Sequence, residues 1–294
     1  MTGAVRYVGA LRVVDGAEVL ARAGGWVLEG THGWARVYSL VPDVFASYAR
    51  IFHPAMREVE ERDLPLKNAS ESRTGVPVRI RHNAVAWCEV SWAEVAHANG
   101  RVAHPAMQWT AITGSYEYDW HGMQPGIWDQ VPQRGSLPLR LTERLCGQLA
   151  AFTSTPELCW CAGWEGDGNM IALRSDPALP RLAMKNRPMI LARGPLSSVP
   201  QKSFTDGFEP WDQRDHPQFA EFFRSPNLWW PDDRAWCVAT DVDLQSTYLG
   251  GPAECVAQLL EDQQLEAMQV TAEQSVTIDA DTINPTPLGD RYNH

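Results

Sequence analysis

The chain has 294 residues, of which 44% are hydrophobic and 21% charged, and its formal net charge is −11. This composition is typical of a folded globular protein and differs from that of a disordered chain. The acidic charge argues against nucleic acid and anionic membranes as main partners, because both are bound through clustered Lys and Arg. No such cluster exists, since the only lysines are Lys67, Lys185 and Lys202.

The absence of targeting signals and the spacing of the cysteines indicate the compartment and the redox state. The first residues lack the apolar run of a secretory signal, and no segment approaches the roughly 18 apolar residues of a membrane span. We therefore expect a cytoplasmic protein. The six cysteines show no metal-ligand spacing, and in a reducing compartment they need no disulfides. The sequence thus predicts free thiols, no metal and no cofactor.

Three segments carry helix signals. In residues 91–101, Ser91 and Glu94 form a capping-box pattern and Gly100 supplies a left-handed stop. Residues 141–152 place an apolar stripe on one face after Thr142, and residues 252–261 begin at Pro252, which suits the first position of a helix. These patterns predict three short helices.

Strand signals are more frequent. Aromatic and β-branched residues dominate eight segments, at residues 34–40, 45–52, 77–90, 157–165, 169–175, 189–196, 235–244 and 266–270. Strands and helices alternate irregularly, and no glycine-rich phosphate loop follows a strand. The expected fold class is therefore α+β, with mixed or antiparallel sheets and a few short helices.

Two passages rich in Pro and Gly, residues 122–138 and 195–217, indicate loops or linkers. We expect one globular unit over residues 1–294, and a division into two lobes near residue 136 is the alternative that these loops allow.

The 13 tryptophans are the extreme feature of the composition. Large rings stabilise a core, but Trp is also enriched where proteins bind partners, so a core role and an aromatic binding surface both stay open.

The run LWWPDDR, residues 228–234, contains two adjacent tryptophans for which a core role and a binding role can be compared directly. It resembles a turn with Pro231 at the second position, in which Arg234 can pair with Asp232 or with its neighbour Asp233. If the segment is extended, Trp229 and Trp230 point in opposite directions, so both cannot enter one core. The run is either an aromatic docking platform beside an Arg–Asp pair, or a structural staple, which means a buried segment that holds the last third of the chain in place.

The next segment, residues 235–244, predicts a strand with Trp236 and Val242 on its core face and Asp241 and Asp243 on the other. Two carboxylates about 7 Å apart suit a hard cation or an acid–base pair, but they also suit an ordinary solvent face.

Glu165 is the last residue of the predicted strand 157–165 and stands at the start of a glycine-rich turn. A partly buried carboxylate at this position could act as a general acid or base. Since no recognisable catalytic motif is present, a hydrolase that uses Glu165, Asp241 or Asp243 with a nearby histidine is the alternative rather than the lead function.

The motifs SPNLWWPDDRAWCVATDVDLQSTYLGG (residues 225–251) and TSTPELCWCAGWEGDG (residues 153–168) resemble a family of uncharacterised proteins from high-GC actinobacteria. RGPL and YARIFHPA add to this resemblance, which extends from about residue 36 to residue 284. It implies a cytosolic bacterial protein with a single architectural unit. The family carries no assigned activity, so it implies no catalytic residue.

The leading hypothesis is a non-enzymatic protein that binds a protein partner or a small ligand through an aromatic, acidic surface. Its expected binding residues are Trp229, Trp230, Asp232, Arg234, Asp241, Asp243 and Glu165.

Overall fold

Most strands of the protein join one large antiparallel sheet. The structure is a computed structural model, and it describes residues 5–59, 77–82, 85–114, 123–167, 170–185, 187–201, 204 and 223–285. Nine strands follow one another in the order β1-β2-β9-β7-β10-β11-β12-β3-β13, and β8 pairs with β9 outside this path. Their bounds are β1 Tyr7–Val8, β2 Leu11–Val13, β3 Ser47–Phe52, β7 Cys159–Trp164, β8 Leu182–Met184, β9 Arg187–Gly194, β10 Leu228–Pro231, β11 Cys237–Ala239, β12 Ser246–Gly251 and β13 Ala267–Val270.

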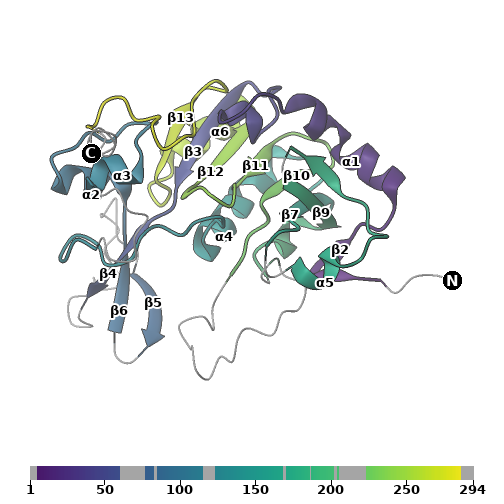
Figure 1. The fold of residues 1–294 in the computed structure, drawn as a ribbon, viewed down its shortest axis with the longest axis horizontal. Coiled ribbons are helices and arrows are strands. Elements are labelled where there is room, and N and C mark those ends of the chain that lie inside the picture. Colours follow the sequence, from purple (N-terminus) through teal and green to yellow (C-terminus); the bar gives the residue numbers. More distant parts are fainter. Residues whose placement is uncertain are drawn as a thin grey trace, which may run out of the picture.

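A second, smaller antiparallel sheet stands at one side of the molecule (Figure 1). It consists of β4 (Ala55–Val59), β6 (Val85–Val90) and β5 (Pro77–His82), in that order. Only His53 and Pro54 separate β3 of the large sheet from β4 of the small one. One continuous segment therefore links the two sheets.

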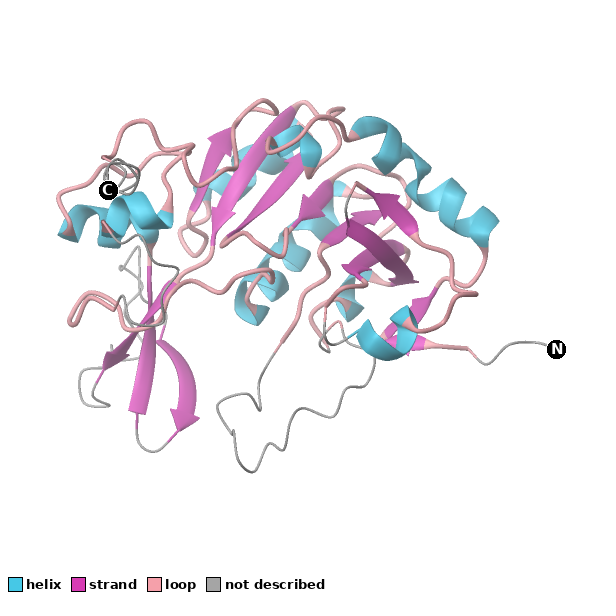
Figure 2. Cartoon of the chain, viewed as in Figure 1, coloured by secondary structure: helices cyan, strands magenta, loops and turns pink. Residues whose placement is uncertain are grey.

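Helices are short and few compared with strands, as Figure 2 shows. They are α1 (Ala17–Gly30), α2 (Trp92–Ala98), α3 (Trp109–Thr113), α4 (Leu139–Leu149), α5 (Ile171–Arg174) and α6 (Ala253–Glu261). Single 3-10 turns occur at Val37–Ser39, Ala150–Phe152 and Leu196–Ser198. The predicted α+β class with antiparallel sheets and short helices is confirmed.

The large sheet is buried on both of its faces. Residues from α1 pack with one face, where the core includes Trp160, Trp230 and Tyr248. Residues from α4 and α6 pack with the other face, around Trp229 and Trp236. The result is three layers, with helix α1 and helices α4 and α6 on opposite sides of the sheet (Figure 1).

The predicted helices are present with small changes at their starts. The side chain of Ser91 accepts from the backbone N–H of Glu94, and Glu94 accepts from the backbone N–H of Ser91, so the capping box is confirmed. Gly100 has φ +63°. Pro252 is the N-cap residue of α6 rather than its first helical residue, and α4 starts at Leu139, before Thr142.

Helix α1 has no counterpart among the predicted helices. It contains adjacent glycines, Gly24 and Gly25, which are poor helix formers. A Cβ atom on Gly24 would lie 2.5 Å from Cδ1 of Leu182 in β8. Close packing of α1 against β8 therefore explains a glycine that local propensity disfavours.

Two predicted strands are wrong. Residues 37–39 form a 3-10 turn within the segment 34–40, and residues 171–174 form helix α5 within the segment 169–175. Both segments are too short for the difference between a strand and a helical turn to be read from periodicity.

A third hydrophobic cluster joins the two sheets. It combines Phe52 of β3 with Trp92 of α2, Trp109 of α3 and Trp128, whose rings contact one another at centroid distances of 5.0–5.3 Å. These tryptophans lie in a core, as one of the two alternatives for the Trp-rich composition expects. No helix among the described residues has both the length and the apolar content needed to cross a membrane.

Candidate functional site

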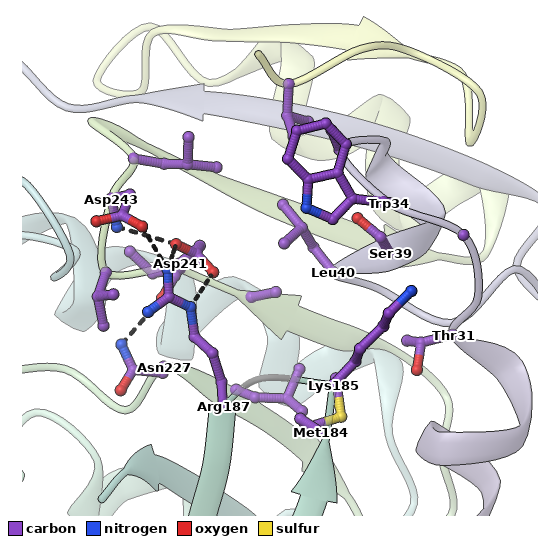
Figure 3. Close-up of a pocket in the computed structure, with 18 of the residues that line it drawn as sticks. Thr31, Trp34, Ser39, Leu40, Met184, Lys185, Arg187, Asn227, Asp241 and Asp243 are labelled. Carbon is purple, nitrogen blue, oxygen red and sulfur yellow. Dashed lines mark hydrogen bonds and ion pairs between the residues drawn. The ribbon is translucent and has the colours of Figure 1, made fainter. Parts of the chain in front are cut away.

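A pocket of about 530 Å³ opens beside the face of the large sheet that α1 covers. Three parts of the fold surround it (Figure 3): the end of α1 with the loop that follows, the hairpin of β8 and β9, and the turn between β11 and β12. The chain thus brings together segments that are about 200 residues apart in sequence.

The floor of the pocket is apolar because it is the continuation of the sheet core. Met189 of β9, Leu228 of β10 and Ala239 of β11 line the pocket, and all three are buried. Leu40, which packs against the same core from outside the sheet, adds to this floor. The apolar part of a bound molecule would pack on this floor.

Charged side chains form one wall. The guanidinium of Arg187, at the start of β9, donates to Asp241 with Nε–Oδ2 and Nη2–Oδ1 distances of 3.1 and 3.3 Å. Its Nη2 also pairs with Asp243. The same guanidinium stacks over the ring of Trp164, with its carbon 5.1 Å from the ring centroid. One arginine therefore neutralises part of the charge of two carboxylates, and its orientation is fixed by three partners.

The two aspartates belong to a turn, which corrects the predicted strand over residues 235–244. Strand β11 covers only Cys237–Ala239, and the backbone N–H of Leu244 donates to the carbonyl of Asp241. The backbone N–H of Asp243 donates to Oδ1 of Asp241 at 2.9 Å. This side-chain bond offers the backbone an alternative to a sheet ladder, and it ends the strand.

Asn227 fixes the base of this wall. Its Nδ2 donates to the carbonyls of Gly135 and Thr240 at 3.3 and 3.0 Å, and its Oδ1 accepts from the backbone N–H of Trp164. Asn227 is buried and lines the pocket. These bonds tie the residue before β10 to Trp164 of β7, to Thr240 after β11 and to Gly135 in the loop before α4, so the backbone around the pocket is held in place.

Two further residues stand at the mouth. Trp34, in the loop after α1, leaves 73% of its surface exposed. Lys185 follows β8, and its ammonium group lies on the side of the pocket that carries Thr31 and Ser39 (Figure 3). The sequence alone did not identify Trp34, Lys185, Arg187 or Asn227 as site residues. The one signal for two of them is that Lys185 and Arg187 lie just before the predicted strand 189–196, where they indicate a positively charged end of a hairpin.

Trp229 and Trp230 do not reach the pocket mouth. They lie in β10, and their exposed fractions are 0% and 1%. The two rings point to opposite faces of the sheet, as expected for an extended segment, and both faces are covered: Trp229 contacts Trp236 on one side, and Trp230 packs against Trp26 of α1 on the other. The arrangement agrees with the staple alternative and leaves no ring surface for docking.

The acidic residues after these tryptophans have structural contacts. Pro231 is the first residue of the turn, not the second, since the N–H of Arg234 donates to its carbonyl. Asp232 accepts from Nε1 of Trp160 at 2.8 Å. Arg234 donates to the carbonyl of Arg22 and lies 5.6 Å from the ring centroid of Trp26. The described contacts of Arg234 thus join it to α1 instead of to an aspartate.

Asp233 also holds a turn together. It accepts hydrogen bonds from Thr153 and Ser154. Burial acts to raise the pKa of Asp233, but these hydrogen bonds outweigh it and leave the pKa below its ordinary value.

Glu165 lies outside the pocket lining. Its carboxylate pairs with Arg181 at 2.7 Å in the turn after β7. His32, the histidine in the pocket lining, stacks on Tyr38 and bonds to Asp43 at 3.3 Å. The structure therefore brings Asp241 and Asp243 together but does not add Glu165 to them.

The described part of the chain contains no group of three or more His, Cys, Asp or Glu side chains that could hold a metal ion. The six cysteines are free and buried. No protein-family model matches this chain, and comparisons with characterised proteins and with solved structures give no match either. The resemblance to the actinobacterial family stays a prediction.

Proposed function

We propose that this protein binds a small organic molecule in the pocket between the loop after α1, the hairpin of β8 and β9, and the turn that carries Asp241. The observation that supports this most is the combination of size and lining: about 530 Å³ with an apolar floor and polar groups at its edge. Ligand sites in proteins have this character and volumes of about 300–1,000 Å³.

The contacts of the charged wall favour binding over hydrolysis. A general base or a nucleophile needs a carboxylate that is free to take a proton or attack. Asp241 and Asp243 both pair with Arg187, and Glu165 pairs with Arg181. The hydrolase alternative would need these ion pairs to open first.

A small ligand is also favoured over a protein partner. The tryptophans expected to form a docking platform, Trp229 and Trp230, are buried. The exposed indole of Trp34 stands beside a cavity, where it suits a molecule that enters the pocket. The expected cytoplasmic location and the absence of a cofactor remain parts of this proposal.

A fragment screen followed by ligand-observed NMR tests the proposal. The variant Leu40→Trp replaces an aliphatic side chain of the pocket floor by a bulky indole, which should fill part of the pocket. Val44→Trp adds the same indole at a position that is 63% exposed and outside the lining. We expect fragments to bind the parent and Val44→Trp but not Leu40→Trp. Hits that bind all three proteins equally, or a screen without any hit at millimolar concentration, would refute the proposal.

A further inference from the structure

We propose that the ligand of this pocket is a planar ring that carries one carboxylate, with the ring on Trp34 and the carboxylate at Lys185. This inference rests on the proposed function and names the class of ligand. It follows from the charges that are already paired, from the position of the one indole at the mouth, and from the backbone that holds this indole there.

The first step is the charge balance. Arg187 is engaged by Asp241 and Asp243, and His32 bonds to Asp43. Lys185, the remaining cation of the lining, forms no ion pair with any residue in the described ranges. A ligand anion would therefore find one available ammonium group, on the side of the pocket opposite the aspartates (Figure 3).

The same balance limits the charge of the ligand to one. Two carboxylates share the wall, and the chain as a whole carries a formal charge of −11. A phosphate or a dicarboxylate would bring a second negative charge close to Asp243, whose side chain is 72% exposed, without a second free cation to offset it. A single carboxylate needs only Lys185.

The second step is the indole. An exposed tryptophan gains burial when a flat molecule covers it, and Lys185 and Trp34 line the same cavity. Thr31 and Ser39 line the same part of the pocket (Figure 3), but their hydroxyl groups already donate to the carbonyls of Val27 and Arg36, so the ammonium group of Lys185 is the group that recognises the carboxylate. Ring and carboxylate are thus recognised by adjacent parts of the pocket.

The third step is the loop that presents the indole. Ala35 has φ +57°, a left-handed conformation that costs energy for a residue with a Cβ atom. Gly33 has φ +63°, and a Cβ there would lie 2.6 Å from the ring of Tyr38. The carbonyl of Ala35 accepts from the N–H of Val276 at 3.1 Å. The loop is therefore anchored in a strained form that keeps Trp34 exposed, which is typical of a binding element.

Three probes of the same shape separate charge from ring: 2-naphthoate, 2-naphthamide and 2-naphthylmethylamine. We expect the naphthoate to bind the parent about tenfold more tightly than the neutral amide, as one hydrogen bond to a charged group predicts. Lys185→Met should bring the naphthoate to the affinity of the amide, and Lys185→Arg should restore the difference. Arg22→Met removes an exposed cation outside the lining and serves as the control.

The ring is tested with Trp34→Ala, which should weaken the naphthoate and the amide by the same factor, and Trp34→Phe, which should recover part of the loss. Isothermal titration measures all these affinities. Equal affinity for the naphthoate and the amide, tighter binding of the amine, or full binding to Trp34→Ala would overturn the inference but leave a binding pocket in place. If none of the probes binds while other fragments do, the ring class is wrong, and if no fragment binds at all, the proposed function fails.

Discussion

Two buried titratable groups of this protein should change its stability with pH in opposite directions. Glu266 accepts hydrogen bonds from the backbone N–H groups of Trp92 and Ala93, each at 2.7 Å. Burial raises the pKa of Glu266 from 4.5 to about 7, although these bonds and the charge of Arg50 lower it and Glu94 raises it further. The folded state therefore holds a proton on Glu266 that the unfolded chain has already released.

His53 is the second group. Burial lowers the pKa of His53 from 6.5 to about 4, with a smaller lowering from the charge of Arg50. The carbonyl of Gln133, 2.6 Å from Nδ1, requires a proton on that nitrogen, so Nε2 accepts from the hydroxyl of Thr247 at 2.9 Å. The folded protein keeps His53 neutral at a pH where the unfolded chain is protonated.

The free energy of unfolding rises with pH wherever the unfolded chain binds more protons than the folded protein, and it falls with pH in the opposite case. The contribution of Glu266 is fully present below pH 4.5 and is lost as the pH rises to 7. The contribution of His53 is present above pH 6.5 and is lost as the pH falls to 4. At about 1.4 kcal/mol per pH unit, each amounts to about 3 kcal/mol between pH 4.5 and 6.5. The two contributions offset each other in this range.

Single substitutions expose each contribution. In Glu266→Gln the free energy of unfolding should rise by about 3 kcal/mol from pH 4.5 to 6.5, because the opposing contribution of Glu266 is gone and that of His53 remains. In His53→Gln it should fall by about the same amount. Both groups are neutral in the folded state through most of this range, and the parent should change little.

Urea unfolding followed by tryptophan fluorescence at pH 4.5, 5.5 and 6.5 measures these slopes. Either variant also loses stability at every pH through altered hydrogen bonds, but that loss shifts the curve without changing its slope. If both variants have the same pH slope as the parent, the assignment of perturbed pKa values to Glu266 and His53 is refuted.

Two further predictions concern the core. Trp229→Ala and Trp230→Ala should each lower the free energy of unfolding by about 3–5 kcal/mol in denaturant titrations, since both rings are fully buried; a loss below 1 kcal/mol for either would contradict its place in the core. Burial raises the pKa of Cys159 and of Cys255 to about 12, so the native protein should resist iodoacetamide at pH 8 and yield six modified cysteines after unfolding, as mass spectrometry would show. Fast labelling of the native protein would contradict this.

The buried tryptophans also show why an aromatic composition is ambiguous. In an antiparallel sheet with one solvated face, a Trp-Trp pair would expose one ring. Here α1 covers the face that receives Trp230, and the opposite face packs with α4 and α6 around Trp229. Nothing within β10 distinguishes these cases, because the covering helices come from other parts of the chain.

Local patterns alone determined the α+β class, the capped helix at residues 91–101 and most of the strands, because hydrogen bonds and side-chain periodicity within a few residues decide these features. The pocket lay outside the reach of such patterns. Asp241 and Asp243 were found as an acidic pair, but Arg187, which neutralises them, is 54 and 56 residues away. The indole of Trp34 reaches the same cavity only because α1 packs on the sheet. Tertiary structure decided these neighbours, since charge pairing and burial depend on distances in space that sequence spacing does not contain.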